Sequence, residues 1–171
     1  MATMLTVDIP GWRSLQLEVL LLDVNGTLTL DGELLAGVET GLNALTQVGV
    51  LDVQLVSADR FGRLDFIAAR LGVRAKRLEA GRPEMAQKAD VVRQLGAERV
   101  VAIGNRASDV DMLGEAALGI AIVGREGLCR GCTGSGGCGG AVDQRCAGTA
   151  PESETAHRYA QALAGDQGKC V

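Results

Sequence analysis

Apolar positions follow two different patterns along the chain, one typical of buried strands and the other of helices. Residues Leu17 to Val24 form a nearly unbroken apolar run, typical of a strand buried on both faces of a parallel sheet. From Val38 to Val48 the apolar residues recur at helical spacing, and Gly49 follows directly. This pattern predicts a helix that ends at a glycine C-cap.

The same alternation continues to about residue 124. It predicts strands over 52–57, 77–81, 99–105 and 118–124, and helices over 61–72, 83–96 and 108–117. Strands that alternate with helices of about ten residues favour parallel crossover units in an α/β sheet with helices on both faces. Upstream, residues 4–20 contain a Pro-Gly turn between two strand-like runs, which predicts an N-terminal β-hairpin.

Polar residues follow the predicted strands at the edge where parallel sheets bind ligands. They are Asp23, Asn25, Gly26 and Thr27 after the first strand, Ser57, Ala58 and Asp59 after the second, and Gly104, Asn105, Ser108 and Asp109 after a later one. Lys88, at the start of a helix on a face we expect to be exposed, completes the set. Asp59 is the expected helix cap. A carboxylate, a hydroxyl, an ammonium and a second carboxylate on one rim are suited to phosphoryl transfer.

Each group has a chemical reason to be present. A carboxylate such as Asp23 can attack phosphorus, but its charge repels the phosphate unless cations and hydrogen-bond donors neutralise it. Mg²⁺ and Lys88 are the expected cations. The backbone N–H groups of the Asn25–Thr27 turn and the Ser57 hydroxyl are the expected donors to the phosphate oxygens.

The segments "DVNGTLT", "VSADRFG" and "VVAIGNRASDVDMLGEAALGIAI" occur in the order found in a known superfamily. From Met4 to Gly127 the chain resembles the haloacid dehalogenase superfamily of aspartate-nucleophile phosphatases, and more closely its small capless members that are similar to P-type ATPases. The resemblance implies a Rossmann-like three-layer fold and Mg²⁺ as cofactor. It also implies Asp23 as nucleophile, Ser57 and Ala58 at the phosphate, Lys88 orienting both, and metal contacts by Asp23, Asn25, Asn105 and Asp109.

Four positions depart from the phosphatase pattern. The residue two after the nucleophile is Asn25, where ordinary phosphatases of the superfamily have an aspartate that protonates the leaving group and activates water. An amide hydrogen-bonds but does not carry a proton in that role, although the Asn25 carbonyl still suits a metal. Asn105 stands where many relatives have a metal-binding aspartate. Arg106 and Ser108 replace the expected glycine and asparagine, and together these changes predict altered metal affinity.

Composition narrows the classes of partner. The formal net charge is −4, aromatic residues make up 2% of the chain, and no dense Lys/Arg cluster exists, so we expect no nucleic-acid partner. The first residues lack the pattern of a signal peptide, and no apolar stretch approaches the length of a membrane span. These features predict a cytoplasmic protein without membrane insertion.

The end of the chain differs from the rest. Residues 128–171 are rich in glycine and contain all five cysteines, which are Cys129, Cys132, Cys138, Cys146 and Cys170. A zinc knuckle, a disordered tail and an out-of-frame continuation of the domain are the three alternatives, and the third fits best because a shifted reading of 150–161 is compatible with a helical pattern. We therefore assign 1–127 to the hydrolase domain and 128–171 to an atypical tail.

These observations favour a Mg²⁺-dependent phosphohydrolase that acts on ATP or a small phosphoester through an aspartyl-phosphate on Asp23, slowly because of Asn25. The alternative is a non-catalytic regulatory module that responds to phosphorylation or metal, and a receiver-like module ranks third. Because no cap is inserted between Asp23 and Ser57, the site is expected to be open. A protein partner or a second copy of the chain then becomes a candidate lid.

Overall fold

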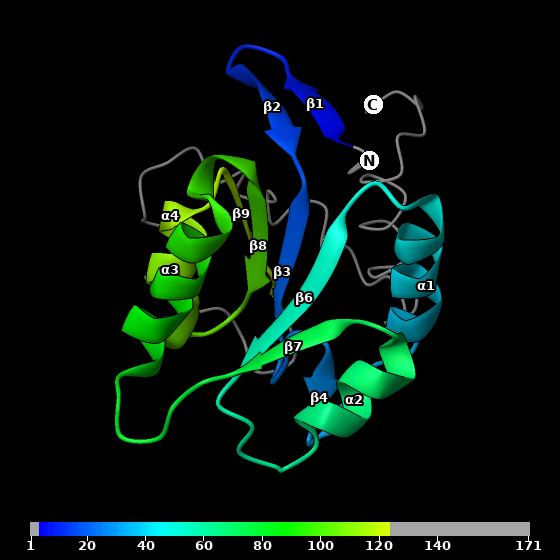
Figure 1. The fold of residues 1–171 in the computed structure, drawn as a ribbon, viewed down its shortest axis with the longest axis vertical. Coiled ribbons are helices and arrows are strands. Elements are labelled where there is room, and N and C mark those ends of the chain that lie inside the picture. The colour runs from blue at the N-terminus through cyan, green and yellow to red at the C-terminus, as the bar shows by residue number, and fades with distance from the viewer. Residues whose placement is uncertain (1–3, 124–171) are drawn as a thin grey trace.

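The computed structural model describes residues 4–123 (Figure 1). Its helices are α1 (Val38–Val48), α2 (Leu64–Leu71), α3 (Glu84–Leu95) and α4 (Val110–Glu115), with short 3₁₀ turns at Ala97–Arg99 and Ala107–Asp109. Its strands are β1 (Leu5–Ile9), β2 (Arg13–Leu17), β3 (Val19–Asp23), β4 (Thr29–Leu30), β5 (Glu33–Leu34), β6 (Asp52–Ser57), β7 (Arg74–Arg77), β8 (Val100–Gly104) and β9 (Leu118–Ala121). Among these described residues no helix is long and apolar enough to cross a membrane. The predictions for 128–171, and the boundary at 127, lie outside the described residues.

Five strands form one parallel sheet in the order β7-β6-β3-β8-β9, which confirms the predicted α/β class. β3 lies in the centre, where Leu22 is level with Leu55 of β6 and Ile103 of β8. The chain moves from β3 outward to β6 and β7, and then crosses to β8 and β9 on the other side of β3. The direction of winding therefore reverses between β3 and β8, and such a reversal opens a crevice at the carboxyl ends of the strands.

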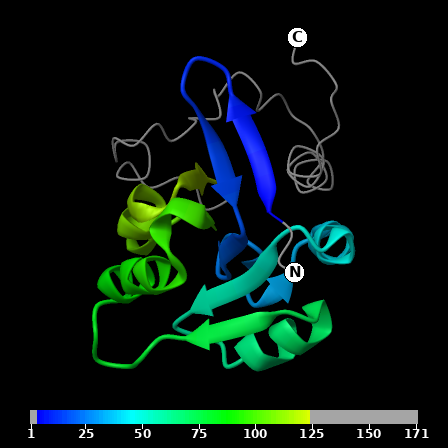
Figure 2. The same cartoon turned by 45° about the horizontal axis from the view of Figure 1, so that its top comes forward.

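Helices cover both faces of this sheet, with α1 and α2 on one side and α3 and α4 on the other (Figures 1 and 2). The alternation of side chains along β3 divides the core accordingly. Leu20 and Leu22 pack in the cluster that contains residues of α1 and α2, whereas Val19 and Leu21 pack in the cluster that contains residues of α3 and α4. Because both faces are covered, every residue of β3 is buried. The predicted three-layer arrangement is thus confirmed.

The predicted N-terminal hairpin is also present. β1 and β2 pair antiparallel, with Leu5 opposite Leu17, and extend from one end of the main sheet (Figure 2). A second, very short antiparallel pair, β4 and β5, follows the turn after β3. Between β3 and β6 the chain forms only this pair and α1, so no cap domain is inserted there.

Two sequence predictions are wrong in detail. The strand expected over 77–81 lies at Arg74–Arg77, because this edge strand is fully exposed and its charged sequence has no apolar pattern to mark it. Lys88 was expected on an exposed helical face at the start of a helix. It lies instead in the second turn of α3 and is buried, with 2% of its surface exposed.

Candidate active site

The polar residues that follow the strands meet at the carboxyl edge of the sheet, where the winding reverses. Asp23 is the last residue of β3, Ser57 is the last residue of β6, and Asn105 follows β8 directly. All three side chains are buried, with 2% of each residue exposed. Parallel strands end at the same edge, and this common edge is the reason why residues far apart in the sequence come together here.

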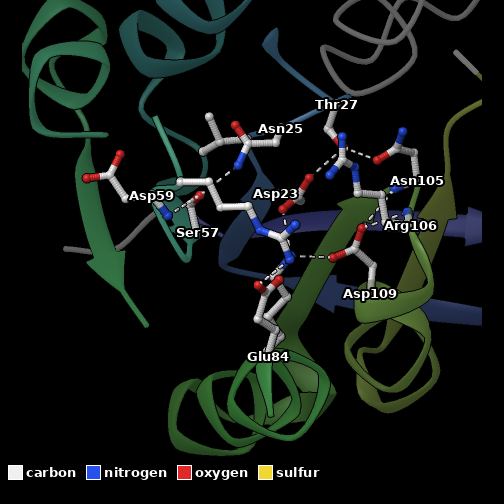
Figure 3. A network of polar contacts seen from close by, with 12 residues as sticks. Asp23, Asn25, Thr27, Ser57, Asp59, Glu84, Asn105, Arg106 and Asp109 are labelled. Carbon is white, nitrogen blue, oxygen red and sulfur yellow. Dashed lines mark hydrogen bonds and ion pairs between the residues drawn. The ribbon is translucent and has the colours of Figure 1, made fainter. Parts of the chain in front are cut away.

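A lysine between two carboxylates forms the centre of the site (Figure 3). The Nζ atom of Lys88 lies 2.6 Å from Oδ1 of Asp23 and 2.6 Å from Oδ1 of Asp109. The side chains of the three residues are at most 3% exposed. One ammonium therefore bridges two buried carboxylates, and the trio carries a net charge of about −1 when all three groups are ionised.

Burial and charge act on these groups in opposite directions. Burial raises the pKa of Asp23 to about 6, Lys88 opposes this rise, and the charge of Asp109 adds to it. For Lys88, burial lowers the pKa, but the two carboxylates outweigh this effect and the net pKa is raised. At neutral pH the lysine is therefore charged and Asp23 is mainly a carboxylate.

Asp109 is fixed by the loop that precedes it. Its Oδ2 atom accepts hydrogen bonds from the backbone N–H groups of Asn105, at 3.0 Å, and of Arg106, at 2.9 Å. Gly104 makes this approach possible, because a Cβ at position 104 would lie 2.7 Å from the carboxyl carbon of Asp109. The absence of a side chain at 104 thus allows the loop to close around the carboxylate.

Thr27 connects the nucleophile candidate with Asn105. Its hydroxyl lies 3.1 Å from Oδ2 of Asp23 and 3.4 Å from Oδ1 of Asn105, and it has one proton for the two acceptors. The N–H groups of Gly26 and Thr27 donate to the carbonyls of Thr29 and Val24 within the turn. Gly26, with φ of 83°, therefore gives the turn its shape, and these two N–H groups are occupied within the turn.

Ser57 and Asn25 face each other from neighbouring strands. Nδ2 of Asn25 lies 3.3 Å from the Ser57 hydroxyl, which also accepts the backbone N–H of Asp59 at 3.0 Å. The hydroxyl oxygen accepts both bonds, and its own proton makes no hydrogen bond within residues 4–123. Ala58 is partly exposed between these groups. Asp59 caps α2 as predicted, since its Oδ1 accepts from the N–H groups of Arg63 and Leu64.

The side chains at this edge fit a hard divalent cation by the chemistry of their donors. Asp23, Asn105 and Asp109 offer carboxylate and amide oxygens, which Mg²⁺ prefers, and Asn25 adds a backbone carbonyl. The shared Thr27 proton leaves either Asp23 or Asn105 with a free oxygen lone pair. Within residues 4–123 no group of three or more His, Cys, Asp or Glu side chains forms a metal cluster.

Two residues near the site escaped the sequence analysis. Arg60 follows the Ser57–Asp59 segment, and its Nη2 lies 2.7 Å from Oε1 of Glu84 at the first position of α3. The spacing of four between Glu84 and Lys88 was a usable signal, because it places both on one helical face. For Arg60 the motif contained the residue but gave no sign of its partner, since the contact joins the loop after β6 to the start of α3, which only the fold brings together.

We expect Lys88→Met to lower the free energy of unfolding by about 3–5 kcal/mol, because it leaves two buried carboxylates without their common partner. Denaturant unfolding in metal-free buffer measures this change. Lys76→Met, at an exposed position of β7, is the matched control and is expected to have little effect. A loss at position 88 no larger than that of the control would contradict the paired arrangement.

Comparison with known proteins defines the class of this fold and site. Residues 2–117 match the model of the haloacid dehalogenase-like hydrolases. The chain therefore belongs to this hydrolase family, as the order of its motifs predicted. A search of curated proteins gives no significant match.

Solved structures of two phosphatases show the same fold at low sequence identity. A 3-deoxy-D-manno-octulosonate 8-phosphate phosphatase from Moraxella catarrhalis, in complex with magnesium, phosphate and KDO, is 21% identical with a TM-score of 0.52, over 68% of this chain and 71% of that one. A phospho-aspartyl intermediate analogue of phosphoserine phosphatase is 17% identical with a TM-score of 0.50, over 61% and 86%. A HAD family hydrolase from Streptomyces avermitilis is 23% identical with a TM-score of 0.49, and this chain covers 66% of its length.

Proposed function

We propose that the chain is a Mg²⁺-dependent phosphohydrolase that acts on ATP or another small phosphorylated molecule through an aspartyl-phosphate on Asp23. The observation that carries this proposal is the buried Asp23–Lys88–Asp109 arrangement at the reversal point of the sheet. It combines a nucleophile, a fixed positive charge and free hydrogen-bonding capacity at one edge. Membership of a hydrolase family and the likeness of the fold to two phosphatases support the same reaction.

The proposed reaction has two displacement steps, the formation of the aspartyl-phosphate and its hydrolysis. The Asp23 carboxylate attacks phosphorus, the bond from phosphorus to the leaving oxygen breaks, and the leaving group takes a proton from water. Water then attacks the aspartyl-phosphate, which releases inorganic phosphate and restores the carboxylate. Lys88 keeps Asp23 ionised before the first displacement and orients it in both, and the Ser57 hydroxyl can donate its proton to a phosphate oxygen.

Mg²⁺, held by Asp23, the Asn25 carbonyl, Asn105 and Asp109, would neutralise charge that develops on the phosphoryl oxygens. Asn25 lies where it can position Ser57 but carries no proton to the leaving group or from water. Both displacements then depend on bulk water for proton transfer. We therefore propose slow turnover and a phosphoenzyme that persists, as the resemblance of the motifs to P-type ATPases suggests.

Asn25 also favours a second candidate, a regulatory module that is phosphorylated on Asp23 and does not release phosphate. The two candidates share the phosphoenzyme and differ in its lifetime. In either case no cap is inserted between β3 and β6, so we propose a protein lid or a second copy of the chain as the cover of the site, and a cytoplasmic setting for both.

The phosphoenzyme can be sought directly. Incubation of the full chain with Mg²⁺ and acetyl phosphate or ATP should add the mass of one phosphoryl group to the peptide that contains Asp23, and hydroxylamine should remove it. Label on a different peptide, or no label from any donor, would refute the proposal. Phosphate release that accompanies the label favours the hydrolase, and a stable label without release favours the regulatory module.

A further inference from the structure

An exposed ion pair connects two sides of the candidate site at its edge. Arg60 lies in the loop that follows β6, and Glu84 begins α3, the helix that carries Lys88. The two side chains are 63% and 28% exposed, so the pair is open to solvent. Figure 3 shows the Glu84 side chain directed from α3 toward Asp23 and Asp109.

The helix fixes the distance between this pair and the reacting carboxylate. Glu84 and Lys88 are four residues apart on one face of α3, which corresponds to about 6 Å along the helix axis. Lys88 contacts Asp23 and Glu84 contacts Arg60, so α3 places the ion pair one helical turn before the lysine that contacts the reacting carboxylate. A guanidinium has five N–H donors, and Glu84 is the partner that residues 4–123 provide for Arg60. Its other donors are thus available to a ligand.

We propose that Arg60 binds a second anionic group of the substrate, so that the site prefers phosphoanhydrides and other molecules with two neighbouring anionic groups over simple monoesters. The inference rests on the proposed function, because it places the transferred phosphoryl group at Asp23. A second phosphate or carboxylate bonded a few atoms away from the transferred group would extend from Asp23 toward this ion pair. Guanidinium groups suit such oxyanions because they offer parallel N–H donors.

Glu84 gives this recognition its selectivity. Without ligand it holds the guanidinium at the mouth, and an exposed pair of this kind is weak enough for a doubly charged group to displace. When Arg60 is removed, the bare Glu84 carboxylate faces the second anionic group and repels it. The pair therefore makes the affinity for a ligand depend on its number of anionic groups, whereas the transferred group itself is bound by Lys88 and Ser57.

The test compares equilibrium binding of inorganic phosphate and methylenediphosphonate to the full chain by calorimetry, at fixed Mg²⁺. The wild type should bind the diphosphonate more tightly, and Arg60→Ala should reduce this preference roughly tenfold, the size of one charge-assisted hydrogen bond at an exposed site. Glu84→Gln should increase the preference, because it removes the competing carboxylate. Arg70→Ala, which breaks the similarly exposed Arg70–Glu39 pair between α1 and α2, is the matched control and should leave the preference unchanged.

An equal preference in wild type and Arg60→Ala would overturn the inference, as would failure of the wild type to bind either ligand. Because the readout is binding, it does not depend on turnover. If the label on Asp23 forms while the preference fails to respond to Arg60→Ala, this inference is wrong and the proposed function stands. If the preference responds and no label forms, Arg60 does bind the second anionic group, but the phosphoenzyme on Asp23 and with it the proposed function are wrong.

Discussion

Asp23→Asn is expected to reduce Mg²⁺-dependent phosphate release from p-nitrophenyl phosphate and ATP to the background of the buffer. Asp23 is buried at the end of the central strand, where Lys88 and Thr27 orient its two oxygens. An amide has nearly the same shape but is not the nucleophile that an aspartyl-phosphate requires. The substitution is therefore expected to act mainly on the rate of the chemical step, which steady-state phosphate release measures.

Asp111→Asn is the matched control, because it removes an exposed carboxylate in the first turn of α4, close in sequence to Asp109. Its rate should equal that of the wild type. Lys88 keeps Asp109 as a partner in the Asp23 variant, and circular dichroism can confirm that this variant is folded. Release that persists in Asp23→Asn and still requires Mg²⁺ would place the nucleophile elsewhere.

Asn25→Asp is expected to raise the turnover number by about 10²–10⁴, the usual contribution of a positioned general acid and base. The Asn25 side chain is partly buried and points toward Ser57 across the mouth of the site, so a carboxyl group at this position has access to the leaving group and to water. It also introduces a titrating group. The rate should therefore gain a second dependence on pH beside that of Asp23, whose pKa is about 6, and the lifetime of the phosphoenzyme should shorten.

Asn25→Ala separates proton transfer from the loss of the contact with Ser57. It removes the 3.3 Å contact without adding a proton carrier, so it should bring no gain in turnover. An equal gain in both variants would show that Asn25 restrains Ser57 and does not limit proton transfer. If Asn25→Asp leaves a stable label and no release, the regulatory module becomes the better description.

Much of the fold followed from local patterns. β3 is buried on both faces, which leaves a continuous apolar run in the sequence. α1 is buried on one face, which leaves apolar residues at helical spacing. The position of strand β7 could not be predicted from a local pattern, because an exposed edge strand needs no apolar alternation. Its position is set by pairing with β6, which is a tertiary contact.

The position of the candidate site residues at one edge of the sheet was likewise predictable, and their contacts and burial were not. Asp23, Ser57 and Asp109 were expected at one edge because parallel strands end together. The burial of Lys88 was not expected, since a lysine in a helix is ordinarily solvated. Its neighbours in the sequence do not reveal that two carboxylates from other elements contact it. The raised pKa of Asp23, to about 6, is a consequence of that same burial.

The sequence by itself determined the α/β class, the order of the elements and the set of groups suited to phosphoryl transfer, because local periodicity and strand ends are properties of short segments. Only the tertiary structure decided which side chains form hydrogen bonds or ion pairs with one another. It placed Lys88 between Asp23 and Asp109, Thr27 between Asp23 and Asn105, and Arg60 against Glu84. These contacts join residues from different elements, and their energies depend on distance and burial, which no single segment of sequence encodes.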